Sequence, residues 1–136
     1  MAIVNAAVGM LLRSPLHGVL SGSTALIRHT GRRSGRTITT PTQYAPSGEG
    51  IVIFVGKWDT KSWWRNFRTP YDADVLVRGQ WLPVTAEAVI GGDDPARAAS
   101  LLGDYSVTFP RVLKGLGEGT LVKQALRAVL VKCVPR

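Results

Sequence analysis

Side chains that bind metals or form disulfides are scarce in this sequence of 136 residues. It contains one cysteine, Cys133, and two histidines, His17 and His29, which are twelve positions apart. A single cysteine excludes an internal disulfide and any metal site built from several thiolates, and it fits a reducing compartment. No carboxylate lies near either histidine in the sequence, so we expect no metal site.

The usual signatures of catalysis by side chains are missing. The sequence has no G-x-G-x-x-G dinucleotide fingerprint, no G-x-x-x-x-G-K-[ST] phosphate loop and no G-x-S-x-G nucleophile elbow. Its one pair of adjacent carboxylates, Asp93–Asp94, precedes Pro95 and suits the start of a helix. We therefore expect no catalytic acid, base or nucleophile, and a reaction at this protein would be carried by a cofactor.

No hydrophobic run is long enough to span a membrane. Arg13 and Pro15 interrupt the apolar start of the chain, whereas a bilayer span needs about 20 apolar residues. The basic residues that open an export signal are absent as well. We expect an apolar helix within residues 1–20, which either packs on the core or lies on a membrane surface. The predicted location is the cytoplasm, with association to the inner face of the cell membrane left open.

Acidic residues are also few. There are 17 lysines and arginines against 9 aspartates and glutamates, a net charge of +8, in a chain that is 45% hydrophobic and 19% charged. The composition is that of a globular protein, and its positive surplus suits an anionic partner. Nucleic acid is the weakest candidate, because the aromatic residues cluster with apolar neighbours and do not alternate with basic residues. An acidic lipid surface and a multiply charged small molecule remain as candidate partners.

Turn signals and alternating patterns predict a single α+β domain over residues 1–136, an antiparallel barrel with helices at its edges. We expect strands at 24–30, 36–45 and 51–56, and the β-branched run of the last predicts the most buried strand. A hairpin over 72–90 is expected with a type II′ turn at Gly79–Gln80. Helices are expected after Thr60 as a cap, from Pro95 to Gly103, and as an amphipathic helix over 120–134.

The bend between the first two predicted strands carries an unusual amount of positive charge. In "HTGRRSGRTITTP", Gly31 and Gly35 bracket Arg32, Arg33 and Ser34, and Arg36 follows. Glycine-bracketed amides, a serine hydroxyl and planar guanidinium groups suit a phosphate or carboxylate ligand. A solvated basic turn explains the same residues, and core packing explains the aromatic cluster around Trp63 and Trp64 as well as a pocket wall does.

Four segments, "TGRRSGR", "TTPTQY", "VGK" and "SWWRNF", occur in an order that resembles the deazaflavin-dependent nitroreductases and quinone reductases of actinobacteria. That family has a split β-barrel fold, a barrel that commonly pairs as a homodimer. The resemblance implies an oxidoreductase that transfers hydride from reduced coenzyme F-420, a deazaflavin with a phosphodiester and a glutamate tail, to a quinone-like or nitro acceptor. FMN is the weaker alternative as cofactor.

The resemblance also implies which residues contact the cofactor and the hydrophobic acceptor. The arginines and serine of the bend would hold the phosphate and tail, and the strand and the two segments that follow would surround the ring. The implied cofactor-binding residues are Arg32, Arg33, Ser34, Arg36, Ile38, Thr39, Thr40, Pro41, Thr42, Gln43, Gly56, Lys57, Ser62, Trp63, Trp64 and Asn66. Tyr105 and Phe109 would line the acceptor side, although ordinary packing explains them equally well.

The sequence departs from the family pattern at three places. Ile38 stands where relatives often have an arginine, for which Arg36 would compensate, and Trp58–Asp59 replace glycines, so that Trp58 could crowd the ring. Arg65 replaces an apolar residue. These departures keep a second hypothesis open, a cofactor-free split barrel that binds lipid or fatty acid.

Overall fold

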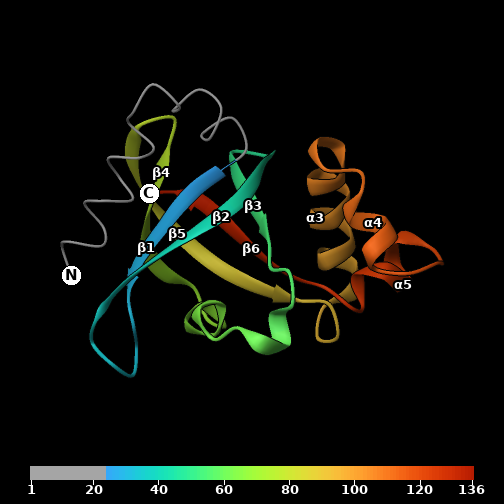
Figure 1. Cartoon of the computed structure of the whole chain (residues 1–136), viewed down its shortest axis with the longest axis horizontal. Helices are drawn as coiled ribbons and strands as arrows, with labels where there is room; N and C mark the ends of the chain where they lie inside the picture. Colours follow the sequence, from blue (N-terminus) through green and yellow to red (C-terminus); the bar gives the residue numbers. More distant parts are fainter. Residues whose placement is uncertain (1–23) are drawn as a thin grey trace.

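The strands of the described chain close into one antiparallel barrel, in the order β1-β2-β3-β6-β5-β4 around its circumference (Figure 1). The computed structural model describes residues 24–136, so the helix predicted within residues 1–20 lies outside the described residues. The strands are β1 (Thr24–Thr30), β2 (Thr37–Ser47), β3 (Gly50–Phe54), β4 (Tyr71–Val77), β5 (Gln80–Ile90) and β6 (Val129–Pro135). The predicted α+β split barrel is confirmed.

Two apolar layers hold the barrel together. Alternate residues of the strands, among them Ile27, Ile53 and Val131, fill the interior, since successive strand residues point to opposite faces. A second cluster lies outside the barrel wall, where Val52 and Leu130 pack under the helices. The wall between β2 and β6 is therefore buried on both faces.

The helices lie together on one side of the barrel (Figure 1). They are α3 (Pro95–Thr108), α4 (Val112–Gly115) and α5 (Leu121–Ala125). Helix α3 begins as predicted, because the Asp94 side chain accepts a hydrogen bond from the Arg97 amide at 3.3 Å. It continues past the predicted end at Gly103, since Leu102 and Tyr105 are buried against the barrel. No helix in residues 24–136 is long and apolar enough to cross a membrane.

The hairpin β4–β5 turns one residue earlier than predicted. Val77 pairs with Gln80, and the residues between them, Arg78 at φ 52° and Gly79 at φ 78°, are both left-handed. Two left-handed residues in succession give a type I′ turn, so the predicted type II′ turn is wrong. The register places Trp81 opposite Leu76, where the two pack together, and this contact outweighs the preference for glycine at the first turn position.

The C-terminal segment is a strand and not the predicted helix over 120–134. Thr120 does cap a helix, because its Oγ1 accepts a hydrogen bond from the Lys123 amide at 3.2 Å, but α5 ends at Ala125. Strand β6 then pairs with β3 along one edge and β5 along the other. Its β-branched valines favour the strand, and pairing at both edges outweighs the helical spacing. Strands β1 and β6 are more buried than β3, which corrects the prediction for 51–56.

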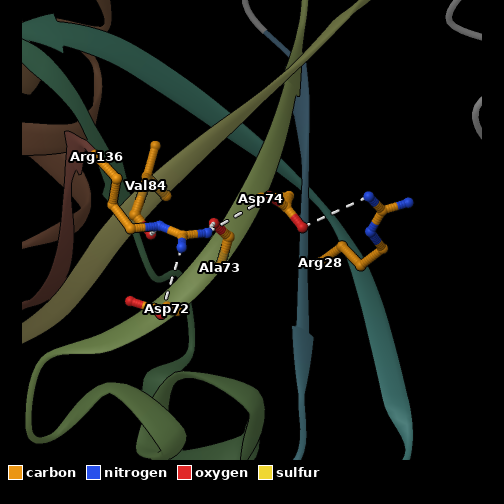
Figure 2. A network of polar contacts seen from close by, with 6 residues as sticks. All are labelled: Arg28, Asp72, Ala73, Asp74, Val84 and Arg136. Atoms are coloured by element: carbon orange, nitrogen blue, oxygen red, sulfur yellow. Dashed lines mark hydrogen bonds and ion pairs between the residues drawn. The ribbon is translucent and has the colours of Figure 1, made fainter.

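The C-terminal Arg136 ties β6 to β4 and β5 in a polar network (Figure 2). Its Nε donates to the Val84 carbonyl at 3.1 Å, and its two terminal nitrogens lie 3.4 Å from an Asp72 oxygen and 3.8 Å from an Asp74 oxygen. Asp74 also pairs with Arg28 of β1 at 3.5 Å. The network joins four strands at one end of the barrel, but these side chains are partly exposed, so we expect only a small contribution to stability.

Candidate functional site

The bend between β1 and β2 is held by its own backbone. The Gly31 amide donates to the Arg36 carbonyl at 2.8 Å, and the Gly35 amide donates to the Gly31 carbonyl at 2.9 Å. Gly35 has φ 68°, a left-handed conformation that glycine adopts at little cost. The Ser34 hydroxyl accepts a hydrogen bond from the Arg36 amide at 3.1 Å. The amides of Arg33 and Ser34 have no partner within residues 24–136, so the bend presents free N–H donors.

The segment after β3 brings more arginine to this bend. It forms two short 3₁₀-helices, η1 (Trp58–Thr60) and η2 (Trp63–Phe67), with Ser62 and not the predicted Thr60 in the capping position of the second. Side chains three apart lie on the same side of a 3₁₀-helix. Trp64 and Phe67 are buried in the barrel core, so Ser62, Arg65 and Arg68 face outward together.

Arg32 fastens the bend to η2. Its amide donates to Asn66 Oδ1 and its Nε donates to the Asn66 carbonyl, both at 2.8 Å, and Nη2 donates to Thr69 Oγ1 at 3.1 Å. The guanidinium also lies 3.9 Å from the centre of the Tyr71 ring, a cation–π distance. Arg32 is therefore tied to the protein through its amide, Nε and Nη2, whereas Arg33 makes no hydrogen bond or ion pair within the described residues.

A pocket of about 410 Å³ lies between the bend and η2. We call it the basic pocket, because four arginines and no carboxylate line it. Its residues are Gly31, Arg32, Arg33, Ser34, Ile38, Ser62, Arg65, Asn66 and Arg68. Within residues 24–136 none of the four arginines forms a salt bridge, so their charge is available to an anion.

A second pocket, of about 470 Å³, follows the free edge of β2, and we call it the edge pocket. Strand β2 pairs with β1 over Thr37–Gln43, but it pairs with β3 only from Tyr44 to Ser47. The other edge of Thr37–Gln43 is open, and Pro41 in its middle fits such an edge because proline has no amide to pair. The pocket is lined by Thr40, Pro41, Thr42, Gln43, Phe54, Val55, Gly56, Lys61, Trp63 and Tyr105.

Two features of the edge pocket suit a polar ligand with a flat apolar part. The Thr42 hydroxyl is buried there without a hydrogen-bond partner among residues 24–136, an arrangement that proteins usually avoid. Tyr105 stacks on Phe109, with ring centres 4.8 Å apart, and it also packs 5.5 Å from the Phe54 ring. Burial raises the pKa of Tyr105 to about 12, so its hydroxyl keeps its proton at neutral pH.

The two pockets adjoin through neighbouring residues of one segment, since Ser62 lines the basic pocket and Trp63 lines the edge pocket. Together they bring in most of the residues that the family resemblance implies. Five of these residues line neither pocket: Arg36, Thr39, Lys57, Trp64 and Phe109.

The structure shows why two of these five residues, Trp64 and Lys57, line neither pocket. Trp64 is 2% exposed, and its Nε1 donates to the Trp58 carbonyl at 2.8 Å, so it belongs to the core. Lys57 has φ 52°, and this left-handed residue turns the chain toward a different pocket on the α4 side. Trp58 follows it there and donates from Nε1 to the Arg127 carbonyl at 3.0 Å. Trp58 therefore lines neither the basic pocket nor the edge pocket.

Sequence reasoning missed Arg68, Lys61 and Phe54, and it took Arg65 only as a departure from the family pattern. The signal for the two arginines was the spacing of Ser62, Arg65 and Arg68, which is three residues each time. That spacing aligns side chains on a 3₁₀-helix but not on the α-helix we expected. Arg65 and Arg68 stand in the basic pocket beside Ile38, whereas Arg36, expected to compensate for Ile38, does not.

Comparison with solved structures places the barrel in the split-barrel class. A chain described as a domain-swapped dimer has a TM-score of 0.58 at 16% identity, with 95% of each chain covered. HutZ, the heme storage protein of Vibrio cholerae, has a TM-score of 0.56 at 13% identity, with 90% of this chain and 89% of that chain covered. At such low identity these likenesses concern the fold alone. The sequence matches none of the curated proteins.

The sequence model of the F-420H(2)-dependent quinone reductase family matches residues 5–111, which include every residue of both pockets. The chain therefore belongs to this family of oxidoreductases.

Proposed function

We propose that this protein binds coenzyme F-420 across the two adjoining pockets and catalyses the reduction of a quinone-like or nitro acceptor by the reduced coenzyme. The observation that carries the proposal is the junction at Ser62 and Trp63, where a pocket lined by arginines meets a pocket along an open strand edge. A ligand with an anionic tail and a flat ring system needs this combination.

The basic pocket fits the phosphodiester and the acidic tail. Arg33, Arg65 and Arg68 have no ion-pair partner among residues 24–136, and a guanidinium pairs well with a phosphate or carboxylate in two-point geometry. The free amides of Arg33 and Ser34 add neutral donors for phosphate oxygens. Arg32 would act by holding the bend against η2, since its Nε and Nη2 donate to Asn66 and Thr69.

The edge pocket fits the ring. The open edge of β2 offers backbone groups in the positions where a neighbouring strand would otherwise bind, and the Thr42 hydroxyl gains a partner when a polar ring edge lies against it. Trp63 and Phe54 supply apolar surface that excludes water. A volume of about 470 Å³ lies within the usual range for cofactor sites.

When bound, the reduced coenzyme supplies a hydride, and one proton must join it to convert a quinone into a hydroquinone. The protein's own residues orient the reactants and keep the site dry, and no strong acid or base is needed. The Tyr105 hydroxyl, which stays protonated, can donate a hydrogen bond to an acceptor oxygen at the wall of the pocket. Phe109 would position Tyr105 by stacking on it.

A fluorescence titration of the purified full-length protein with oxidised coenzyme F-420 tests the proposal. We expect saturable binding, and we expect oxidation of the reduced coenzyme when a soluble naphthoquinone is added. Absence of binding up to high micromolar concentration would refute it. Fatty acid that co-purifies without such binding would favour the lipid-binding alternative, and salt-sensitive retention on DNA would favour nucleic acid.

The oligomeric state remains a prediction. One structural relative is described as a domain-swapped dimer, which supports a homodimer only through the shared fold. Sedimentation equilibrium of the purified protein, with and without the coenzyme, distinguishes a dimer from a monomer.

A further inference from the structure

The helical region lies at the end of the molecule far from β1 and β4 (Figure 1). Exposed apolar side chains gather in this region. Six large apolar side chains of residues 24–136 are exposed, and four of them belong to this region: Val107, Leu121, Val122 and Leu126. Val107 is 84% exposed, and Val122 and Leu126 are each 48% exposed. Leu121 lies close to Gly103, one turn before Val107 on α3, so the apolar residues of α5 adjoin the end of α3.

Helix α5 turns its larger apolar side chains outward, whereas a surface helix ordinarily turns them toward the protein core. Its inward residues are Ala125, which is buried, and Gln124, whose Nε2 donates to the carbonyls of Leu113 at 3.1 Å and Gly117 at 2.9 Å. The larger aliphatic side chains point outward. A surface helix ordinarily turns its polar residues to water, so this arrangement indicates an apolar environment on the outer side.

Exposed cations occur in the same region as the outward aliphatic residues. Arg111, Lys114, Lys123 and Arg127 are exposed in residues 105–127, where Glu118 is the one acidic residue. The Arg127 Nη1 also donates to the Leu116 carbonyl at 2.9 Å, which fixes the loop between α4 and α5. We call the four aliphatic and four basic side chains the α5 surface.

We propose that the α5 surface docks on a lipid bilayer that carries anionic headgroups. Aliphatic side chains can enter the acyl boundary while the exposed cations of the region stay at the level of the phosphates. The apolar surface then leaves water, and the cations gain attraction to the anionic headgroups. A protein partner would have to offer both an apolar and an acidic surface, whereas an anionic bilayer offers both everywhere. Helices α4 and α5 lie beyond the family match at residues 5–111, and the proposal is independent of coenzyme binding.

Vesicle flotation with the full-length protein tests the docking. We expect binding to vesicles of phosphatidylcholine with phosphatidylglycerol, loss of binding at high salt, and little binding to phosphatidylcholine alone. Val122→Gln combined with Leu126→Gln should weaken binding at least about tenfold, because two aliphatic contacts are lost. Lys114→Gln and Lys123→Gln should each weaken it about fivefold. These side chains are exposed, so folding should not change.

Matched controls come from the opposite part of the barrel. Leu82→Gln removes an aliphatic side chain that is 39% exposed on β5, and Arg78→Asn removes one charge at a turn position where asparagine is well accommodated. Both should leave vesicle binding within about twofold of the wild type. Equal losses in the controls, or binding that survives the Val122 and Leu126 substitutions, would overturn the proposal. Self-association that the same two substitutions abolish, without vesicle binding, would overturn it in favour of a contact between two copies of this chain.

Discussion

The bend between β1 and β2 offers a sharp test, because three of its arginines carry the same charge in different structural settings. Arg32 is tied to η2 by its side chain, Arg33 lines the basic pocket without a partner in residues 24–136, and Arg36 is exposed and lines neither pocket. Alanine at each position removes one positive charge. A proposal based on specific contacts therefore predicts three different outcomes, and a proposal based on net charge predicts a single one.

Arg33→Ala should weaken coenzyme F-420 binding about 10- to 150-fold, because a hydrogen bond to a charged group is worth about 1.5–3 kcal/mol. Its stability should change by less than about 0.5 kcal/mol, since the side chain is exposed and has no hydrogen bond, ion pair or ring contact within residues 24–136. Arg65→Ala should weaken coenzyme binding to a similar extent, but it also loses a cation–π contact 5.2 Å from the centre of the Trp64 ring. Arg36→Ala should weaken binding less than about threefold, because only screened, long-range attraction is lost.

Arg32→Ala should act first on stability. It loses two side-chain hydrogen bonds and a cation–π contact, which together are worth about 2 kcal/mol. Fluorescence titration gives the affinities, and urea unfolding followed by tryptophan fluorescence gives the stabilities. Equal weakening by Arg33→Ala and Arg36→Ala would refute the assignment of the basic pocket to the anionic tail. A loss of stability in Arg33→Ala that matches its loss of affinity would show that the bend is only structural.

Three further predictions concern buried groups. Burial lowers the pKa of His29 to about 4, so the folded state binds fewer protons than the unfolded state, whose pKa is about 6.5. The free energy of unfolding should be highest above pH 6.5 and fall by up to about 3 kcal/mol toward pH 4. Urea midpoints measured as a function of pH should show this fall, and an equal fall in His29→Leu would contradict its assignment to His29. Burial raises the pKa of Cys133 to about 12, so a thiol reagent should modify it only after unfolding, and rapid modification of the native protein would count against this burial. Asp104→Ala removes the 2.6 Å hydrogen bond from Ser47 Oγ and should cost about 1.5–3 kcal/mol in urea unfolding, whereas Glu118→Ala, at an exposed position, should cost almost nothing; equal effects would show that the bond is not stabilising.

The sequence by itself determined the features that depend on neighbouring residues. Glycines that bracket the bend, the Asp94–Pro95 helix start and the alternation over β1 all describe local conformational preferences, and the structure has them where they were expected. The positive charge of the bend and its resemblance to the family also reside in contiguous residues. Many of the residues that the resemblance implies line the two pockets, but the helix type of η2, and with it the place of Arg65, did not follow from the local pattern.

The tertiary structure decided which side chains meet and which face water. Arg65 and Arg68 join Arg33 only because Trp64 and Phe67 enter the barrel core and leave the opposite side of η2 facing the bend. Residues 129–135 become a strand because β3 and β5 both need a partner to close the barrel, although their spacing with α5 suits a helix. Hydrogen-bond pairing between strands and burial of large aromatic side chains act between segments distant along the chain, so no local pattern could reveal their outcome.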